Sequence, residues 1–217
     1  MADMSFVGNP DRPKRIYSPA GNWKGGYFEL CLVYAEASND DLSRALGALW
    51  AHPAIWGCVA DMWPEPALQP RVDPAVATQL LDHPWYGVAE LPNGVLAAAA
   101  SFVTRGAGYA SKVTLGVPMG ALELAYPVGA YPFADARSLE WRTEVSEWLA
   151  DIGASIYEVA PFRFGLIDHE VAVAVEVETI HQVPEIRWEG YLWPENGQLR
   201  WYPQTQDSPA EITGSLE

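Results

Sequence analysis

The side chains best suited to chemistry are carboxylates and imidazoles that gather in one segment of the C-terminal half. The segment contains Asp168, His169, Glu170, Glu176, Glu178 and His181. Side chains of these two kinds bind divalent metals and act as general acids and bases. For a hydrolase-type enzyme, the sequence therefore indicates Asp168, His169 and Glu170 as the catalytic residues. Any metal ion would be held by His169, Glu170 and His181.

The order of these residues along the chain argues against a shared site. The flanking residues 164–167 and 171–180 are apolar and rich in valine and isoleucine, and they are predicted to be strands. If the chain stays extended between them, successive side chains point to opposite faces of the strand. The four acids then lie on one face and both histidines on the other. We therefore expect a solvated acidic strand face, and a bend at residues 168–170 would be needed to form an enzyme site.

Acidic residues dominate the chain beyond its N-terminal arm. The sequence has 28 aspartates and glutamates against 13 lysines and arginines, which gives a formal net charge of −15. Residues 1–26 contain four basic and two acidic residues, a net charge of +2, which leaves −17 for the remainder. Such a surface repels the phosphates of nucleic acids and anionic lipids and attracts basic proteins. We expect a basic protein partner and no binding to nucleic acid or membranes.

The predicted binding surface combines acids with aromatic anchors. Its acids are Glu144, Glu147, Asp151, Glu170, Glu176 and Glu178. Its anchors are Trp63, Tyr131 and Phe133, which lie in or beside proline-containing loops. Aromatic rings in stiff loops contribute large contact area at interfaces and also stack on sugars. The same rings leave a carbohydrate-binding module as a further alternative, and a structural role in covering the core is open as well.

Established catalytic and cofactor motifs are absent from the sequence. It contains no Gly-x-Ser-x-Gly, His-Glu-x-x-His, Cys-x-x-Cys or Gly-x-Gly-x-x-Gly. Gly106 and Gly108 precede a predicted strand rather than a helix, so they do not form a phosphate-binding loop. We therefore expect no cofactor. Cys31 and Cys58 each lie in an apolar run and are predicted to be buried, reduced thiols.

The hydrophobic patterns predict an α+β fold: a single domain with a mixed, mostly antiparallel sheet packed against two or three helices. The domain is expected at residues 27–202, between an irregular basic arm at 1–26 and a polar tail at 203–217. Helices are predicted at 39–52, 73–81 and 138–159 from apolar residues spaced three and four apart. Strands are predicted at 27–35, 55–60, 85–91, 95–104, 109–117, 164–167, 171–180, 186–193 and 199–202.

The sequence favours a non-enzymatic protein that acts by binding. The longest apolar stretch, residues 94–103, is about half of the roughly 20 residues that a membrane-spanning helix needs. The first residues lack the pattern of a secretory signal, so we expect a cytoplasmic location. The general character is similar to that of bacterial immunity proteins, which inhibit basic toxin domains. We predict an acidic protein-binding module of this kind, with the enzyme second, the carbohydrate-binding module third, and the oligomeric state open.

Overall fold

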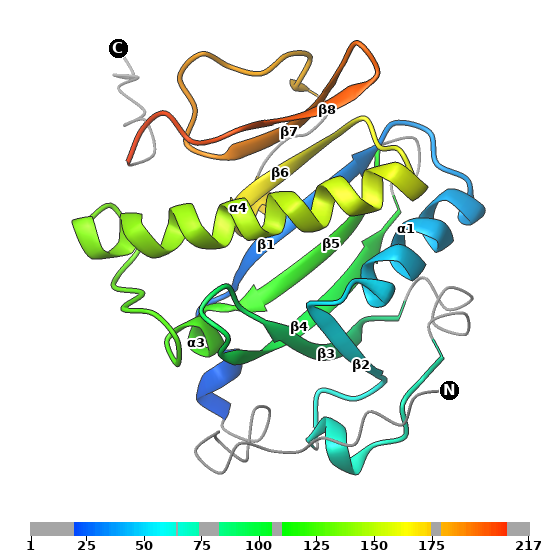
Figure 1. The fold of residues 1–217 in the computed structure, drawn as a ribbon, viewed down its shortest axis with the longest axis vertical. Helices are drawn as coiled ribbons and strands as arrows, with labels where there is room; N and C mark the ends of the chain where they lie inside the picture. The colour runs from blue at the N-terminus through cyan, green and yellow to red at the C-terminus, as the bar shows by residue number, and fades with distance from the viewer. Residues whose placement is uncertain (1–19, 64, 74–82, 106–109, 175–178, 208–217) are drawn as a thin grey trace, which may run out of the picture.

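The protein is an eight-stranded antiparallel sheet with its two long helices on one face (Figure 1). The computed structural model describes residues 20–63, 65–73, 83–105, 110–174 and 179–207. The strands lie in the order β2-β3-β4-β5-β1-β6-β7-β8. This arrangement confirms the predicted α+β class, and every pairing between neighbouring strands is antiparallel.

Most elements lie close to where the sequence pattern places them. The strands are β1 (Tyr27–Tyr34), β2 (Ile55–Val59), β3 (Trp85–Glu90), β4 (Leu96–Thr104), β5 (Ser111–Pro118), β6 (Phe164–His169), β7 (Gly190–Glu195) and β8 (Gln198–Tyr202). The helices are α1 (Asn39–Ala51), α3 (Met119–Leu122), α4 (Ala136–Val159) and α5 (Val171–Ala174), with 3₁₀ turns η1 (Ala20–Trp23) and η2 (Pro66–Leu68).

Strand β1 is central in the sheet and apolar on both faces. It pairs with β5 on one side and β6 on the other. Phe28 and Leu30 face the helices, where the Phe28 ring meets the ring of Trp141 edge to face at 5.2 Å. Cys31 and Val33 face the opposite side, in a second apolar cluster with Phe164. Burial on both faces explains why the strand has an almost continuous apolar sequence.

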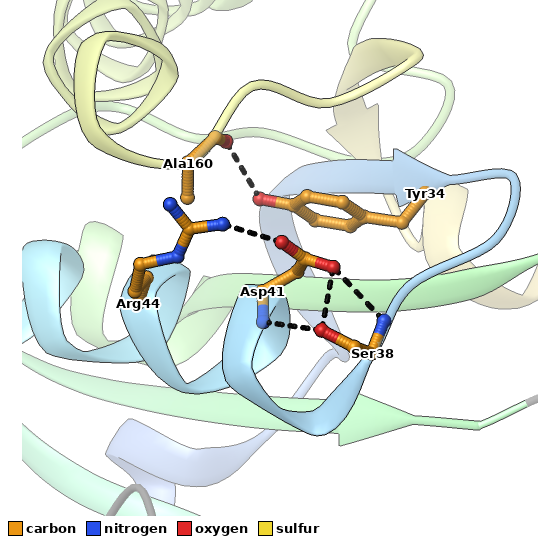
Figure 2. Close-up of polar contacts among 5 residues, drawn as sticks. All are labelled: Tyr34, Ser38, Asp41, Arg44 and Ala160. Carbon is orange, nitrogen blue, oxygen red and sulfur yellow. Dashed lines mark hydrogen bonds and ion pairs between the residues drawn. The ribbon is translucent and has the colours of Figure 1, made fainter.

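Helix α1 begins at a capping box formed by Ser38 and Asp41, shown in Figure 2. The Ser38 hydroxyl accepts a hydrogen bond from the backbone N–H of Asp41, and the Asp41 carboxylate accepts one from the backbone N–H of Ser38. Arg44, one turn later, pairs with the same carboxylate. Above this end of the helix, the Tyr34 hydroxyl donates to the carbonyl of Ala160, which ties β1 to the end of α4.

Helix α4 crosses the sheet with its apolar side inward, as the spacing predicts. Asp135 caps its start by accepting hydrogen bonds from two backbone N–H groups. The buried side includes Trp141, Val145, Leu149, Ile152 and Ile156. Gly153 permits close approach to the sheet, because a Cβ atom there would lie 2.3 Å from Leu192. Val159, which continues the same apolar spacing, is 50% exposed at the last turn.

The predicted strand at residues 171–180 is wrong where the structure describes it. Strand β6 ends at His169, and Glu170 takes a positive φ of 56°, which turns the chain away from the extended path. Val171–Ala174 then form a short helix against β1 and β6. The helix predicted at 73–81 falls almost entirely outside the described residues.

Antiparallel hairpins join β3 to β4 and β7 to β8, and each turn contains a glycine with positive φ. Gly94, between β3 and β4, has φ of 78°. Asn196 and Gly197, between β7 and β8, have φ of 52° and 80°, the pair of positive values that a type I′ two-residue hairpin turn requires. Strand β7 starts at Gly190, four residues later than predicted. Within the described ranges, the helices all fall short of the length and apolar character needed to cross a bilayer.

Candidate binding surface

Asp168 is fully buried at the end of β6, where it forms an ion pair. Its Oδ2 accepts a hydrogen bond from the guanidinium of Arg142 on α4 at 2.7 Å, and its side chain is 0% exposed. The Arg142 guanidinium also stacks on the Trp188 ring at 3.8 Å. Burial raises the pKa of Asp168, an effect that Arg142 and the backbone N–H of His169 oppose. Asp168 was expected on a solvated strand face, and this prediction is wrong. The charge of Arg142, on a helix distant in sequence, offsets the cost of burying the carboxylate.

His169 and Glu170 point in other directions. The Nε2–H of His169 donates to the carbonyl of Gly25 at 2.8 Å, and the ring lies 5.5 Å from the rings of Tyr131 and Phe133. The Glu170 carboxylate accepts a hydrogen bond from the backbone N–H of Tyr27 at 3.2 Å. Each side chain of the predicted triad thus has its own structural partner. The bend at Glu170 does not bring the three together.

A second buried acid lies near Glu170 on the sheet face opposite to α4. Glu29 of β1 is 5% exposed and accepts a hydrogen bond from the backbone N–H of Ala172 at 2.9 Å. Lys112 donates to the carbonyl of the same alanine at 2.7 Å. Burial, with a smaller contribution from the charge of Glu170, raises the pKa of Glu29 to about 7. The hydrogen bond between Ala172 and Glu29 ties α5 to β1.

The residues proposed to hold a metal do not converge in the structure. His181 is exposed and lies 3.4 Å from the Arg163 guanidinium, while His169 contacts the Gly25 carbonyl. Among the described residues, no group of three or more histidine, cysteine, aspartate or glutamate side chains is arranged to hold a metal ion. Glu176 and Glu178 lie outside the described residues.

The exposed side of α4 carries a row of acidic residues. Five carboxylates spaced three, four or seven residues apart are all exposed: Glu140, Glu144, Glu147, Asp151 and Glu158. From the first to the last, the row is about 27 Å long at the helical rise per residue. The two basic residues of the helix do not neutralise it, because Arg142 is buried and Arg137 precedes the row. Within the described part of the chain, none of the five acids forms an ion pair.

A groove lies beside this row, between α4 and the β7–β8 hairpin. It has a volume of about 330 Å³ and is lined by Glu147, Ala150, Asp151, Ala154, Leu192, Leu199 and Trp201. Leu192 and Trp201 are opposite each other in the β7–β8 pairing, so both side chains face α4. Gly190 lets the Trp201 ring pack closely against β7, because a Cβ atom there would be 2.0 Å from the ring. Two carboxylates thus rim an apolar floor.

The predicted aromatic anchors differ in exposure. Trp63 is 43% exposed and Tyr131 is 59% exposed, whereas Phe133 is 4% exposed and belongs to the core. Trp63 meets Trp23 at an interplanar angle of 65°, and Tyr131 meets Phe133 at 89°. These edge-to-face pairs do not present the flat, coplanar platform on which a sugar stacks.

Three of the predicted binding residues, Glu144, Glu147 and Asp151, form one surface, whereas Glu170 lies at the end of β6, where it bonds to β1. The hydrophobic part of that surface, Leu199 and Trp201, was not among the residues predicted from the sequence. The sequence shows that Leu199 and Trp201 share one face of a strand. It does not show that this face lies against α4. No family model, no curated protein and no solved structure matches this chain. The function must therefore be inferred from the geometry of the surface.

Proposed function

We propose that this protein is an acidic binding module that recognises a basic protein through the exposed side of α4. The observation that carries the proposal is the row of five exposed carboxylates on one helix, none of them in an ion pair within the described ranges. The general role is that of an inhibitor or immunity-type protein. We place the interaction in the cytoplasm, where reduced thiols such as Cys31 and Cys58 are the usual state.

The row is unfavourable for the helix on its own. Glu140 and Glu144, and likewise Glu147 and Asp151, are four residues apart, and each such like-charge pair destabilises a helix by about 0.2–0.5 kcal/mol. Lysines and arginines of a partner would relieve this repulsion. The partner would also be attracted from a distance, since an array of one charge sign accelerates association with a protein of the opposite sign.

The enzyme alternative is not favoured by the positions of its proposed residues. Asp168 is engaged by Arg142, His169 by the Gly25 carbonyl, and Glu170 by the Tyr27 backbone. A catalytic acid or base must reach a substrate atom within hydrogen-bond distance. The three groups instead hold α4, the turn at Gly25 and β1 against the end of β6.

The test compares the wild-type protein with a variant in which the row is neutralised. In the variant E140Q/E144Q/E147Q/D151N the shape of the surface is kept and four charges are removed. Both proteins are used to capture partners from cells that express the gene naturally, and a protein retained by the wild type alone is then purified. We expect this protein to be basic and to bind the variant at least about tenfold more weakly in a calorimetric titration.

A matched control removes four exposed acids elsewhere. The variant E36Q/D61N/E123Q/E185Q has the same net charge as the first variant but keeps the row on α4. We expect it to bind the purified partner within about threefold of the wild type. Equal weakening by both variants would show that only net charge matters, and an unchanged affinity of the α4 variant would exclude α4 as the interface.

A further inference from the structure

The groove between α4 and the β7–β8 hairpin has the features of a site for one long cationic side chain. Its volume of about 330 Å³ is at the lower limit of small-molecule sites, so it suits a side chain better than a whole substrate. Its floor is apolar, with Leu192, Leu199 and Trp201. Its rim on α4 is acidic, with Glu147 and Asp151.

Helical geometry places the two acids suitably for a single cation. Glu147 and Asp151 are four residues apart, so their Cβ atoms lie about 5–6 Å from each other on the same side of the helix. One guanidinium or ammonium group between them can therefore contact both carboxylates. Ala150 and Ala154, the remaining α4 residues of the lining, have short side chains that leave the space between the helix and the hairpin open.

The floor matches the remaining part of such a side chain. Lysine and arginine have apolar stems of three or four methylene groups that pack on apolar surface while the charged end remains in contact with water or a partner. An indole ring adds attraction for a cation above its face. In this groove the stem would lie on Leu192, Leu199 and Trp201, with the charged end at the rim.

We propose that this groove holds an arginine or lysine side chain of the basic partner and that it is the anchor point of the interface. The inference rests on the proposed function, because it assigns one contact within the surface of α4. The remainder of the acidic row then attracts and orients the partner, whereas the groove determines which residue of the partner is held. The occupant is defined by its chemistry: a cationic head on an apolar stem.

The experiment titrates the 217-residue protein with two peptides that differ in one charge. The probes are acetyl-Gly-Arg-Gly-amide and acetyl-Gly-citrulline-Gly-amide, since citrulline has nearly the shape of arginine without its charge. Binding is followed by the ¹H–¹⁵N signals of the protein, with the indole signal of Trp201 assigned from the variant W201F. We expect the arginine peptide to shift the Trp201 indole and the amide signals of Glu147 and Asp151 saturably. The citrulline peptide should bind at least about tenfold more weakly.

Two pairs of substitutions on the same helix locate the site. E147Q/D151N should weaken arginine-peptide binding about tenfold, whereas E140Q/E144Q, which removes the same charge outside the groove, should change it by less than about twofold. All four positions are exposed, so an unfolding temperature no lower than that of the wild type shows that both variants are folded. Equal binding of the citrulline peptide, or shifts spread along α4 that spare Trp201, would overturn the inference.

The failure of this inference is distinguishable from failure of the proposed function. If E140Q/E144Q weakens binding of the purified partner while E147Q/D151N does not, the acidic row is the interface and the groove is not its anchor. If neither pair affects partner binding, the interface lies elsewhere and both proposals fail.

Discussion

The guanidinium of Arg142 and the carboxylate of Asp168 form an ion pair of 2.7 Å inside the protein, with exposures of 3% and 0%. The pair joins α4 to the end of β6 and thereby fixes how the acidic helix lies on the sheet. Trp188 covers the guanidinium on one face. The position of the proposed binding surface therefore depends on a charge pair that solvent does not reach.

Removal of one partner of this pair should be strongly destabilising. Arg142→Met leaves the Asp168 carboxylate buried without its cation, and we expect a loss of about 3–5 kcal/mol in the free energy of unfolding. The double variant Arg142→Met/Asp168→Leu removes both charges and should lose less than the single variant. Urea unfolding of the wild type and the variants measures the loss in the free energy of unfolding for each variant. If the double variant loses the sum of the losses of Arg142→Met and of Asp168→Leu, each measured alone, the pair is not coupled.

Glu29 should make stability depend on pH. Its pKa in the folded protein is about 7, above the ordinary value of 4.5, because burial disfavours the carboxylate. The folded state thus binds the proton more tightly than the unfolded state, so the contribution of Glu29 is fully present below pH 4.5 and is lost as pH rises through 7. The whole loss is on the order of 3 kcal/mol.

Substitution by glutamine tests this prediction. Glu29→Gln does not ionise, so its free energy of unfolding should fall less between pH 5 and pH 8 than that of the wild type. Urea unfolding at several pH values gives the comparison, and Glu36→Gln, at an exposed position, provides the control. Parallel pH profiles for the wild type and Glu29→Gln would contradict the assignment.

Both cysteine thiols should be inert in the folded protein. Burial raises the pKa of Cys31 and of Cys58 to about 12, so only about one thiol in ten thousand is ionised at pH 8. The two residues lie on β1 and β2, which have three strands between them and are about 19 Å apart across the sheet. They cannot form a disulfide with each other in this fold.

A thiol-reactive chromophore at pH 8 measures this directly. We expect no reaction with the native protein on the timescale in which an introduced exposed cysteine, Glu36→Cys, reacts completely. After unfolding in guanidinium chloride, two thiols of the wild type should react. Rapid modification of a native thiol would show that one of the two cysteines is accessible.

The capping box at the start of α1 predicts a smaller effect. Ser38→Ala removes the hydroxyl that accepts a hydrogen bond from the Asp41 backbone, and we expect a loss of about 1 kcal/mol. For a protein of this size, that loss corresponds to a decrease of about 2–4 °C in unfolding temperature. Ser38→Thr keeps an acceptor and should lose less. An unchanged unfolding temperature in Ser38→Ala would mean that the cap does not contribute to stability.

The parts of the fold that sequence could predict are those set by local patterns. The spacing of apolar residues located α1 and α4, and Asn196 with Gly197 located the last hairpin. The error at residues 171–174 has a physical cause. Alternating valine and alanine match a strand, but the positive φ at Glu170 turns the chain and the segment becomes helical against β1.

The candidate site was predictable only in part for a similar reason. The exposure of Glu144, Glu147 and Asp151 follows from helical periodicity alone, so the sequence could identify these acids. The burial of Asp168 depends on Arg142, 26 residues earlier, and the groove depends on α4 lying beside β8. Such contacts between distant segments are determined by tertiary packing, which no local pattern records.

The most direct test of the central claim is the dependence of the association rate on ionic strength. Surface plasmon resonance would record association of the purified partner with the wild type and with E140Q/E144Q/E147Q/D151N at 50 and 300 mM salt. If the α4 row guides binding, the wild-type rate constant should fall about tenfold or more over this range, and that of the variant should be low and nearly constant. Equal rate constants and equal salt dependence for the two proteins would contradict the claim.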